Sequence, residues 1–211
     1  MKQRATVFLV LLSLCSPALA SGPGFLINGG TMDFDYLQVP PGSINGHFGS
    51  SGSLVDVPAT EGTAATTFVL NGVNYLAVVG ATENGTNFVD GGVVIVGDLA
   101  PITTGTYSLD GVTSFFVFVD DAVGWVPPAD LWNTNWTLEL ASIVAAGKHV
   151  SVSGSVTLTS VNSLLVAGTF TATTFDADTG VTLAVTSGTF NVDSTTGTES
   201  TSWSSVKALY R

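Results

Sequence analysis

Hydrophobic and polar residues alternate along several segments of the chain with the two-residue period of a β-strand, and no helical period persists for three turns. In residues 150–158 the even positions are Val, Val, Gly, Val and Leu, whereas the odd positions are Ser, Ser, Ser and Thr. This pattern predicts an antiparallel strand with its even-numbered face in the core and its odd-numbered face in solvent. Residues 136–140 alternate in the same way.

Two further patterns predict the neighbours of such strands. Asn71-Gly72 separates two apolar stretches within residues 66–80, and this dipeptide supplies the positive φ angles of a two-residue hairpin turn. Residues 93–96 and 115–119 are apolar at every position. Short runs of this kind predict central strands that are covered on both faces.

The acidic segment Asp176-Ala177-Asp178-Thr179-Gly180 separates two further strand patterns. A calcium loop of the EF-hand type needs a glycine at position 6 and a bidentate Glu at position 12, and this segment has neither. Asp and Gly between strands are typical turn residues. We therefore interpret 176–180 as a hairpin turn, with a weak cation site at Asp176 and Asp178 as the alternative. The inward positions change from odd to even after residue 185, which predicts a bulge at Ser187-Gly188.

Turn residues recur at short intervals along the chain, and no long linker marks a domain boundary. The sequence therefore predicts a single all-β domain over residues 21–211. Its expected architecture is an antiparallel β-sandwich of short strands, with a small closed β-barrel as the alternative.

Residues 1–20 have the form of a secretory signal peptide: a basic start, an apolar stretch and an Ala-x-Ala end. The apolar stretch is too short to span a bilayer as a helix, and we expect cleavage after Ala20. Lipid attachment at Cys15 is a rival interpretation, but Leu14 is larger than the residue that a lipoprotein signal needs before its cysteine. An exported location is expected, in the periplasm, at the cell surface or outside the cell.

Removal of the signal peptide leaves a chain without cysteine, so disulfides cannot support its fold. It also leaves three cationic residues against sixteen acidic ones, a formal net charge of −13. The negative electrostatic field of a chain with this charge repels phosphate backbones and anionic membrane surfaces, so nucleic acid is a poor partner. Because charged residues make up only 10% of the chain, Ser, Thr and Asn must provide most of its polar surface.

Several strand and turn motifs occur in a recognisable order, and they are Gly105-Thr106-Tyr107, Val152-Ser153-Gly154-Ser155, the Asp-Thr-Gly turn at 178–180, and Gly188-Thr189-Phe190. This order resembles uncharacterised exported β-sandwich lipoproteins of bacteria, which are common in Bacteroidota. The resemblance covers the C-terminal half of the chain. It implies a β-sandwich fold and export, and it implies no activity. The chain departs from the group because it has no proper lipoprotein signal.

Asp33 and Asp35 flank Phe34, so on a strand their side chains share one face about 7 Å apart, twice the ~3.3 Å rise per residue. That separation suits the carboxylate pair of an inverting glycosidase, but such pairs face each other across a cleft. A solvated polar face is the favoured interpretation, and Glu139 is the third acidic candidate for catalysis. His47 and His149 are both expected on solvated faces. Two histidines without a mature cysteine are too few for a structural zinc site.

Three of the four tryptophans lie in residues 124–136, around Pro127-Pro128. Exposed indoles on a stiff loop form flat apolar platforms that suit a glycan or a partner protein, here through Trp125, Trp132 and Asn133. The favoured alternative is that this segment plugs one end of the sandwich.

No nucleophile elbow or metal-ligand cluster is found in the sequence, and no cofactor is expected. The sequence thus favours an exported, non-enzymatic binding or structural module that acts in the cell envelope or outside the cell. The alternative is a β-sandwich hydrolase or lyase that acts on polysaccharide.

Overall fold

The computed structural model describes residues 21–54, 61–83, 88–123 and 149–193, and every regular element in these ranges is a β-strand. The strands are β1 (Ser21–Asn28), β2 (Thr31–Gln38), β3 (Asn45–Ser51), β4 (Gly62–Leu70), β5 (Val73–Glu83), β6 (Phe88–Asp98), β7 (Gly105–Ser108), β8 (Phe115–Val123), β9 (His149–Val161), β10 (Leu165–Phe175) and β11 (Thr182–Asp193). The described residues include no helix that is long and apolar enough to cross a membrane.

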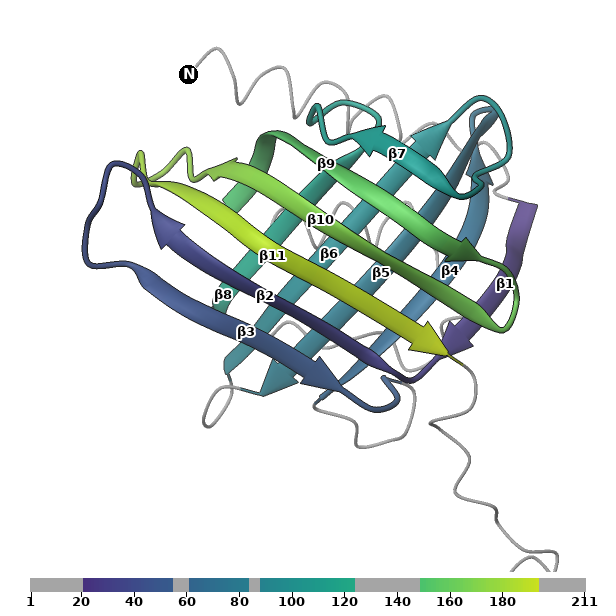
Figure 1. The fold of residues 1–211 in the computed structure, drawn as a ribbon, viewed down its shortest axis with the longest axis horizontal. Coiled ribbons are helices and arrows are strands. Elements are labelled where there is room, and N and C mark those ends of the chain that lie inside the picture. The colour runs from purple at the N-terminus through teal and green to yellow at the C-terminus, as the bar shows by residue number, and fades with distance from the viewer. Residues whose placement is uncertain (1–20, 55–60, 84–87, 124–148, 194–211) are drawn as a thin grey trace, which may run out of the picture.

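All eleven strands belong to one antiparallel sheet, in the order β1-β4-β5-β6-β8-β9-β10-β11-β2-β3, with β7 paired to β9. The sheet curls so that two layers face each other (Figure 1). The front layer contains β9, β10, β11, β2 and β3, and the back layer contains β8, β6, β5, β4 and β1, whose strands cross behind it. The predicted all-β antiparallel class is confirmed. The two layers, however, are halves of one continuous sheet, and β1 and β3 lie at its two ends.

The predicted hairpin at Asn71-Gly72 joins β4 and β5 and is confirmed. Asn71 has a φ of 52° and Gly72 a φ of 79°, the two positive values that this turn requires. The apolar runs at 93–96 and 115–119 lie in the adjacent strands β6 and β8, and all their residues are buried except Phe115, which is half-buried. Because successive side chains point to opposite faces, both faces of these strands are covered, as predicted.

The alternation predicted for β9 is correct only in its C-terminal half. Val156 and Leu158 are buried, but Val152 is 49% exposed and Ser151 is buried in its place. The register with β10 shifts between Thr173 and Thr174, where β9 carries an extra residue. A bulge of this kind moves every earlier side chain of the strand to the opposite face. The buried Ser151 is satisfied because its Oγ accepts a hydrogen bond from the backbone N–H of Phe116, at 2.9 Å.

The same bulge overturns the expectation for His149. Its side chain was expected on a solvated face, but it is only 4% exposed, and its ring stacks on Phe118 with the centroids 6.2 Å apart.

Aromatic rings fill the centre of the core between the layers. Phe34 is fully buried and stacks on Phe48, with ring centroids 4.7 Å apart, while Phe116 and Phe118 approach it edge-on at 5.2 and 5.3 Å. Such pairs add about 0.5–1.5 kcal/mol each beyond the burial of their area.

A second buried cluster lies on the opposite, outer face of the back layer. Its members on the strands alternate with residues that point between the layers, and they are Ala64, Phe68, Leu70, Tyr75, Ala77, Val79, Ala81, Val93, Ile95, Val117 and Val119. Leu54, in the turn after β3, packs into the same cluster.

The acidic segment 176–180 is a hairpin turn between β10 and β11, as predicted. The carboxylate of Asp176 accepts hydrogen bonds from the backbone N–H of Asp178 at 2.8 Å and from the hydroxyl of Thr179 at 2.6 Å. The backbone of Gly180, at a φ of 74°, donates to the carbonyl of Asp176. The predicted bulge follows in β11, where the register with β2 shifts between Thr186 and Thr189 and Ser187 has a φ of 56°.

Candidate functional site

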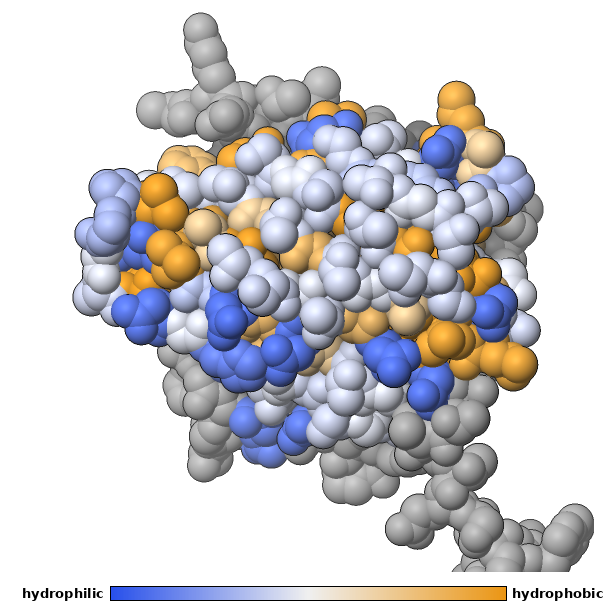
Figure 2. Space-filling model, viewed as in Figure 1, coloured by the Kyte–Doolittle hydropathy of each residue, from blue (hydrophilic) through white to orange (hydrophobic). Residues whose placement is uncertain are grey.

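The outer face of the front layer is an almost continuous surface of small polar side chains, which we call the hydroxyl face. One row crosses six neighbouring strands in register and consists of Thr106, Thr157, Thr169, Thr189, Asp33 and Gly49. Figure 2 shows the middle of this face as mostly pale, weakly polar residues, with a group of strongly hydrophilic ones toward the lower border and hydrophobic ones at the left and right ends. The prediction that uncharged residues supply most of the polar surface is met on this face.

Strand β2 places Asp33 and Asp35 on the hydroxyl face. Met32 and Phe34, which alternate with them, are fully buried between the layers. The strand cannot slip by one residue without moving these apolar side chains into solvent, so the core fixes the outward direction of both carboxylates. The prediction that the two aspartates share one face is therefore correct.

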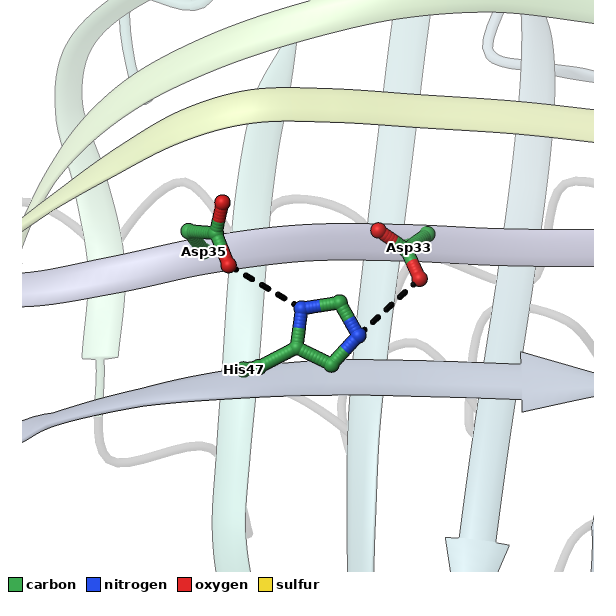
Figure 3. A network of polar contacts seen from close by, with 3 residues as sticks. All are labelled: Asp33, Asp35 and His47. Carbon is green, nitrogen blue, oxygen red and sulfur yellow. Dashed lines mark hydrogen bonds and ion pairs between the residues drawn. The ribbon is translucent and has the colours of Figure 1, made fainter.

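Strand β3 adds a histidine between these two carboxylates. His47 lies directly across from Asp35, and Gly49 lies across from Asp33. Because Gly49 has no side chain, the imidazole can extend along the sheet toward Asp33. Its Nδ1 is 3.0 Å from Oδ1 of Asp35, and its Nε2 is 3.1 Å from Oδ2 of Asp33. Figure 3 shows the ring lying between the two carboxylates, with one nitrogen directed at each.

This geometry favours the protonated imidazole. A neutral histidine has one N–H, so one of its two carboxylate contacts would bring two acceptors together, whereas the imidazolium donates at both nitrogens. The pKa of His47 is accordingly raised above its ordinary value of 6.5, first by the hydrogen bond that the imidazole donates to Asp35 and further by the charges of Asp33 and Asp35, which together outweigh the opposing effect of burial. We call Asp33, Asp35 and His47 the Asp–His–Asp cluster.

Solvent limits the energy of the Asp–His–Asp cluster. The side chains of Asp33, Asp35 and His47 are 50%, 60% and 57% exposed. Exposed ion pairs contribute about 0.2–1 kcal/mol because water screens their attraction and ordering the side chains costs entropy. The cluster therefore adds little to stability, and its interest lies in its position at the border of the hydroxyl face.

The cluster is poorly arranged for acid–base catalysis or for metal binding. The two carboxylates come from one strand and flank a histidine, whereas a glycosidase pair faces the substrate from two sides. The two ring nitrogens point in opposite directions, so His47 cannot bring both aspartates to one ion. Within the described ranges, no group of three or more His, Cys, Asp or Glu side chains is arranged to hold a metal ion. At the turn, both oxygens of Asp176 already accept hydrogen bonds.

The remaining candidates lie outside the described residues. They are Trp125, Trp132, Asn133 and Glu139, as well as Cys15 and the predicted signal peptide. The choice between a tryptophan platform and a plug therefore stays a prediction.

Sequence reasoning placed His47 on the outer face but missed its partners. A usable signal was present, because Pro40-Pro41-Gly42 marks the turn between the two strands. A hairpin centred on Pro41 brings residues whose numbers sum to 82 opposite each other, which pairs His47 with Asp35.

The chain matched no family model, no curated protein and no solved structure when it was compared with each, so the geometry of its own residues carries the functional argument.

Proposed function

We propose that this protein is an exported, non-enzymatic module that binds a partner or serves a structural role in the cell envelope or outside the cell. The observation that carries the proposal is the hydroxyl face. It presents residues from six strands of one sheet, and its ionisable groups Asp33, Asp35 and His47 are bonded to one another.

The chemistry of the hydroxyl face supports recognition by hydrogen bonding. Threonine hydroxyls donate and accept, so a row of them can match the hydroxyls of a glycan or the polar surface of another protein. Thr106 and Thr157, for example, already share a hydrogen bond of 2.9 Å between their side chains. The signal peptide and the cysteine-free mature chain inferred from the sequence support action after export.

The proposal is tested on the purified protein lacking residues 1–20. We expect no turnover above background with panels of glycan, ester and peptide substrates. Robust turnover that survives a second purification step would overturn the non-enzymatic proposal. Export is tested separately by fusing residues 1–30 to a reporter enzyme that is active only outside the cytoplasm, and a reporter that stays inactive would contradict it.

One observation keeps the polysaccharide-active enzyme as a second candidate, since Asp33 and Asp35 do lie together on one exposed face. If the panel detects cleavage of a polysaccharide, the double variant Asp33→Asn with Asp35→Asn decides whether this pair is responsible. Activity that persists in the double variant would assign the chemistry elsewhere, with Glu139 the next residue to replace.

A further inference from the structure

The two end strands of the sheet are protected very differently. Among the described strands, β1 pairs with β4 alone and β3 pairs with β2 alone. Strand β1 contains Pro23, which has no backbone N–H, and its register is irregular between Ser21 and Phe25. Proline and irregularity are two of the features by which proteins prevent another strand from adding to an edge. Strand β3 keeps regular register with β2 from Asn45 to Ser51 and contains no proline.

The hydrogen bonds of β3 show which of its backbone groups face outward. The N–H of Gln38 donates to the carbonyl of Ile44, and the N–H of Gly52 donates to the carbonyl of Gly30. Both contacts join even-numbered residues, so the even positions within β3 turn their backbone groups toward β2. Just past the strand the edge is occupied, because the carbonyl of Gly52 accepts a hydrogen bond from the N–H of Thr63 in β4. The odd positions, Asn45, His47 and Gly49 among them, turn their N–H and C=O groups toward the outer edge, where no other described strand pairs with β3.

Gly49 creates a gap beside a carboxylate at the middle of this edge. A Cβ placed on Gly49 would lie 3.4 Å from Oδ2 of Asp33 and 3.5 Å from Nε2 of His47. A residue added opposite Gly49 would have its Cβ about 5 Å away across the strands. A long basic side chain at that position could cross the gap and reach Asp33.

We propose that the outer edge of β3 receives an extended peptide strand that carries a lysine or arginine opposite Gly49. This inference rests on the binding role proposed above. Backbone hydrogen bonds from the odd-numbered residues provide the attachment, as in other cases of strand addition. The carboxylates of Asp33 and Asp35 select the basic side chain, and they disfavour a second copy of this acidic chain as the occupant.

The protonation state of His47 changes how strongly this edge prefers a basic side chain. Asp33 and Asp35 of β2 face the imidazole, and Glu61 lies at the far end of the same edge, where it accepts a hydrogen bond from Ser51. A protonated His47 neutralises part of the local negative charge and occupies Asp33. Loss of one proton removes the positive charge of the imidazole and leaves it a single N–H, so one of the two carboxylates is released to the incoming cation and the local negative charge increases. Binding of a basic strand should therefore strengthen as pH rises through the pKa of His47, which the cluster raises.

The probe is a dye-labelled nine-residue peptide that alternates threonine and valine around a central arginine. Its binding is measured by the fluorescence anisotropy of the dye as the protein is added. We expect binding that weakens with salt and is stronger at about pH 8 than at about pH 5, on either side of the ordinary histidine pKa of ~6.5. A peptide with central glutamate and one methylated at the backbone nitrogens that face β3 are the controls, and both should bind more weakly. Equal binding of the arginine and glutamate peptides would overturn the proposal.

Variants of the protein locate the site. Gly49→Lys fills the gap with the protein's own cation, and it should fold because the position has room for a Cβ and no positive φ. It should abolish binding of the arginine peptide. Thr171→Lys, an exposed position on β10, makes the same change in net charge away from the edge and should bind like the natural chain. Asp33→Asn should weaken binding roughly two- to fivefold, the range of an exposed ion pair.

Two results would overturn the assignment: unchanged binding in Gly49→Lys, or concentration-dependent self-association that Gly49→Lys removes, which would assign the edge to a second copy. Failure of peptide binding leaves the non-enzymatic module standing, because only turnover or failed export contradicts that broader proposal.

Discussion

The front and back layers of the sheet use the same kind of strand in opposite ways. Front-layer strands β10 and β2 bury one face between the layers and present hydroxyls and carboxylates on the other. Back-layer strands β5, β6 and β8 bury apolar side chains on both faces. The difference teaches that the front layer can offer a surface to a partner, whereas the back layer belongs to the interior on both sides. The candidate site therefore lies on the front layer.

The largest effect is expected where the two layers meet. Phe34→Ala removes the ring that contacts Phe48, Phe116 and Phe118 in the core. A change of this kind costs about 3–5 kcal/mol in the free energy of unfolding. Urea denaturation measures it, with Asp33→Ala on the exposed face of the same strand as the control. A loss as small as that of the control would show that the layers are not tightly packed.

A second variant tests whether the outer face of the back layer is a true second core. Ile95 on β6 is fully buried on that face, and Ile95→Ala should cost about 2–5 kcal/mol. The matched position on the front layer is Thr171, which is exposed, and Thr171→Ala should stay within ~0.5 kcal/mol of the natural chain. Thermal or urea midpoints that change equally in the two variants would remove the distinction between the layers.

A smaller effect is expected at the turn that joins β10 to β11 in the front layer. Asp176→Ala removes the acceptor of two hydrogen bonds at a buried position and should cost about 1–3 kcal/mol. Asp178→Ala changes an exposed side chain of the same turn and should cost less. Calcium in excess should leave the melting midpoint of the natural chain unchanged, because both oxygens of Asp176 are used within the turn. A midpoint that rises with calcium, and no longer rises in Asp176→Asn, would contradict this.

The smallest effect is expected from the Asp–His–Asp cluster. Its hydrogen bonds raise the pKa of His47 in the folded chain, so the folded state binds the proton more tightly than the unfolded state. The resulting stability is fully present below the unfolded pKa of ~6.5 and is lost as pH rises through the higher folded value. Solvent exposure keeps it within the ~0.2–1 kcal/mol of a surface ion pair.

Urea midpoints of the natural chain and of His47→Gln, measured across that pH range, isolate this contribution. The difference between the two chains should shrink as pH rises. A difference that is constant with pH, or that grows, would show that the imidazole is not held as a cation between Asp33 and Asp35.

Much of this architecture follows from local sequence. The all-β class, the Asn71-Gly72 hairpin and the bulge at Ser187 depend on residue periodicity and turn chemistry, which act over a few positions, and the structure confirms them. The two-sided burial of 93–96 also follows, because an uninterrupted apolar run leaves no face for solvent. For the same reason, the alternation around Phe34 correctly placed Asp33 and Asp35 on one outer face.

Tertiary structure decided what local patterns could not. The bulge in β9 appears only when that strand pairs with β10, and it exchanges Val152 for Ser151 in the interior and buries His149 against Phe118. The curl that joins both layers into one sheet depends on pairings between distant strands, which leave no short-range signal. The contact of His47 with Asp33 likewise needs the register of β2 with β3 and the space above Gly49, two features that exist only once the strands have paired.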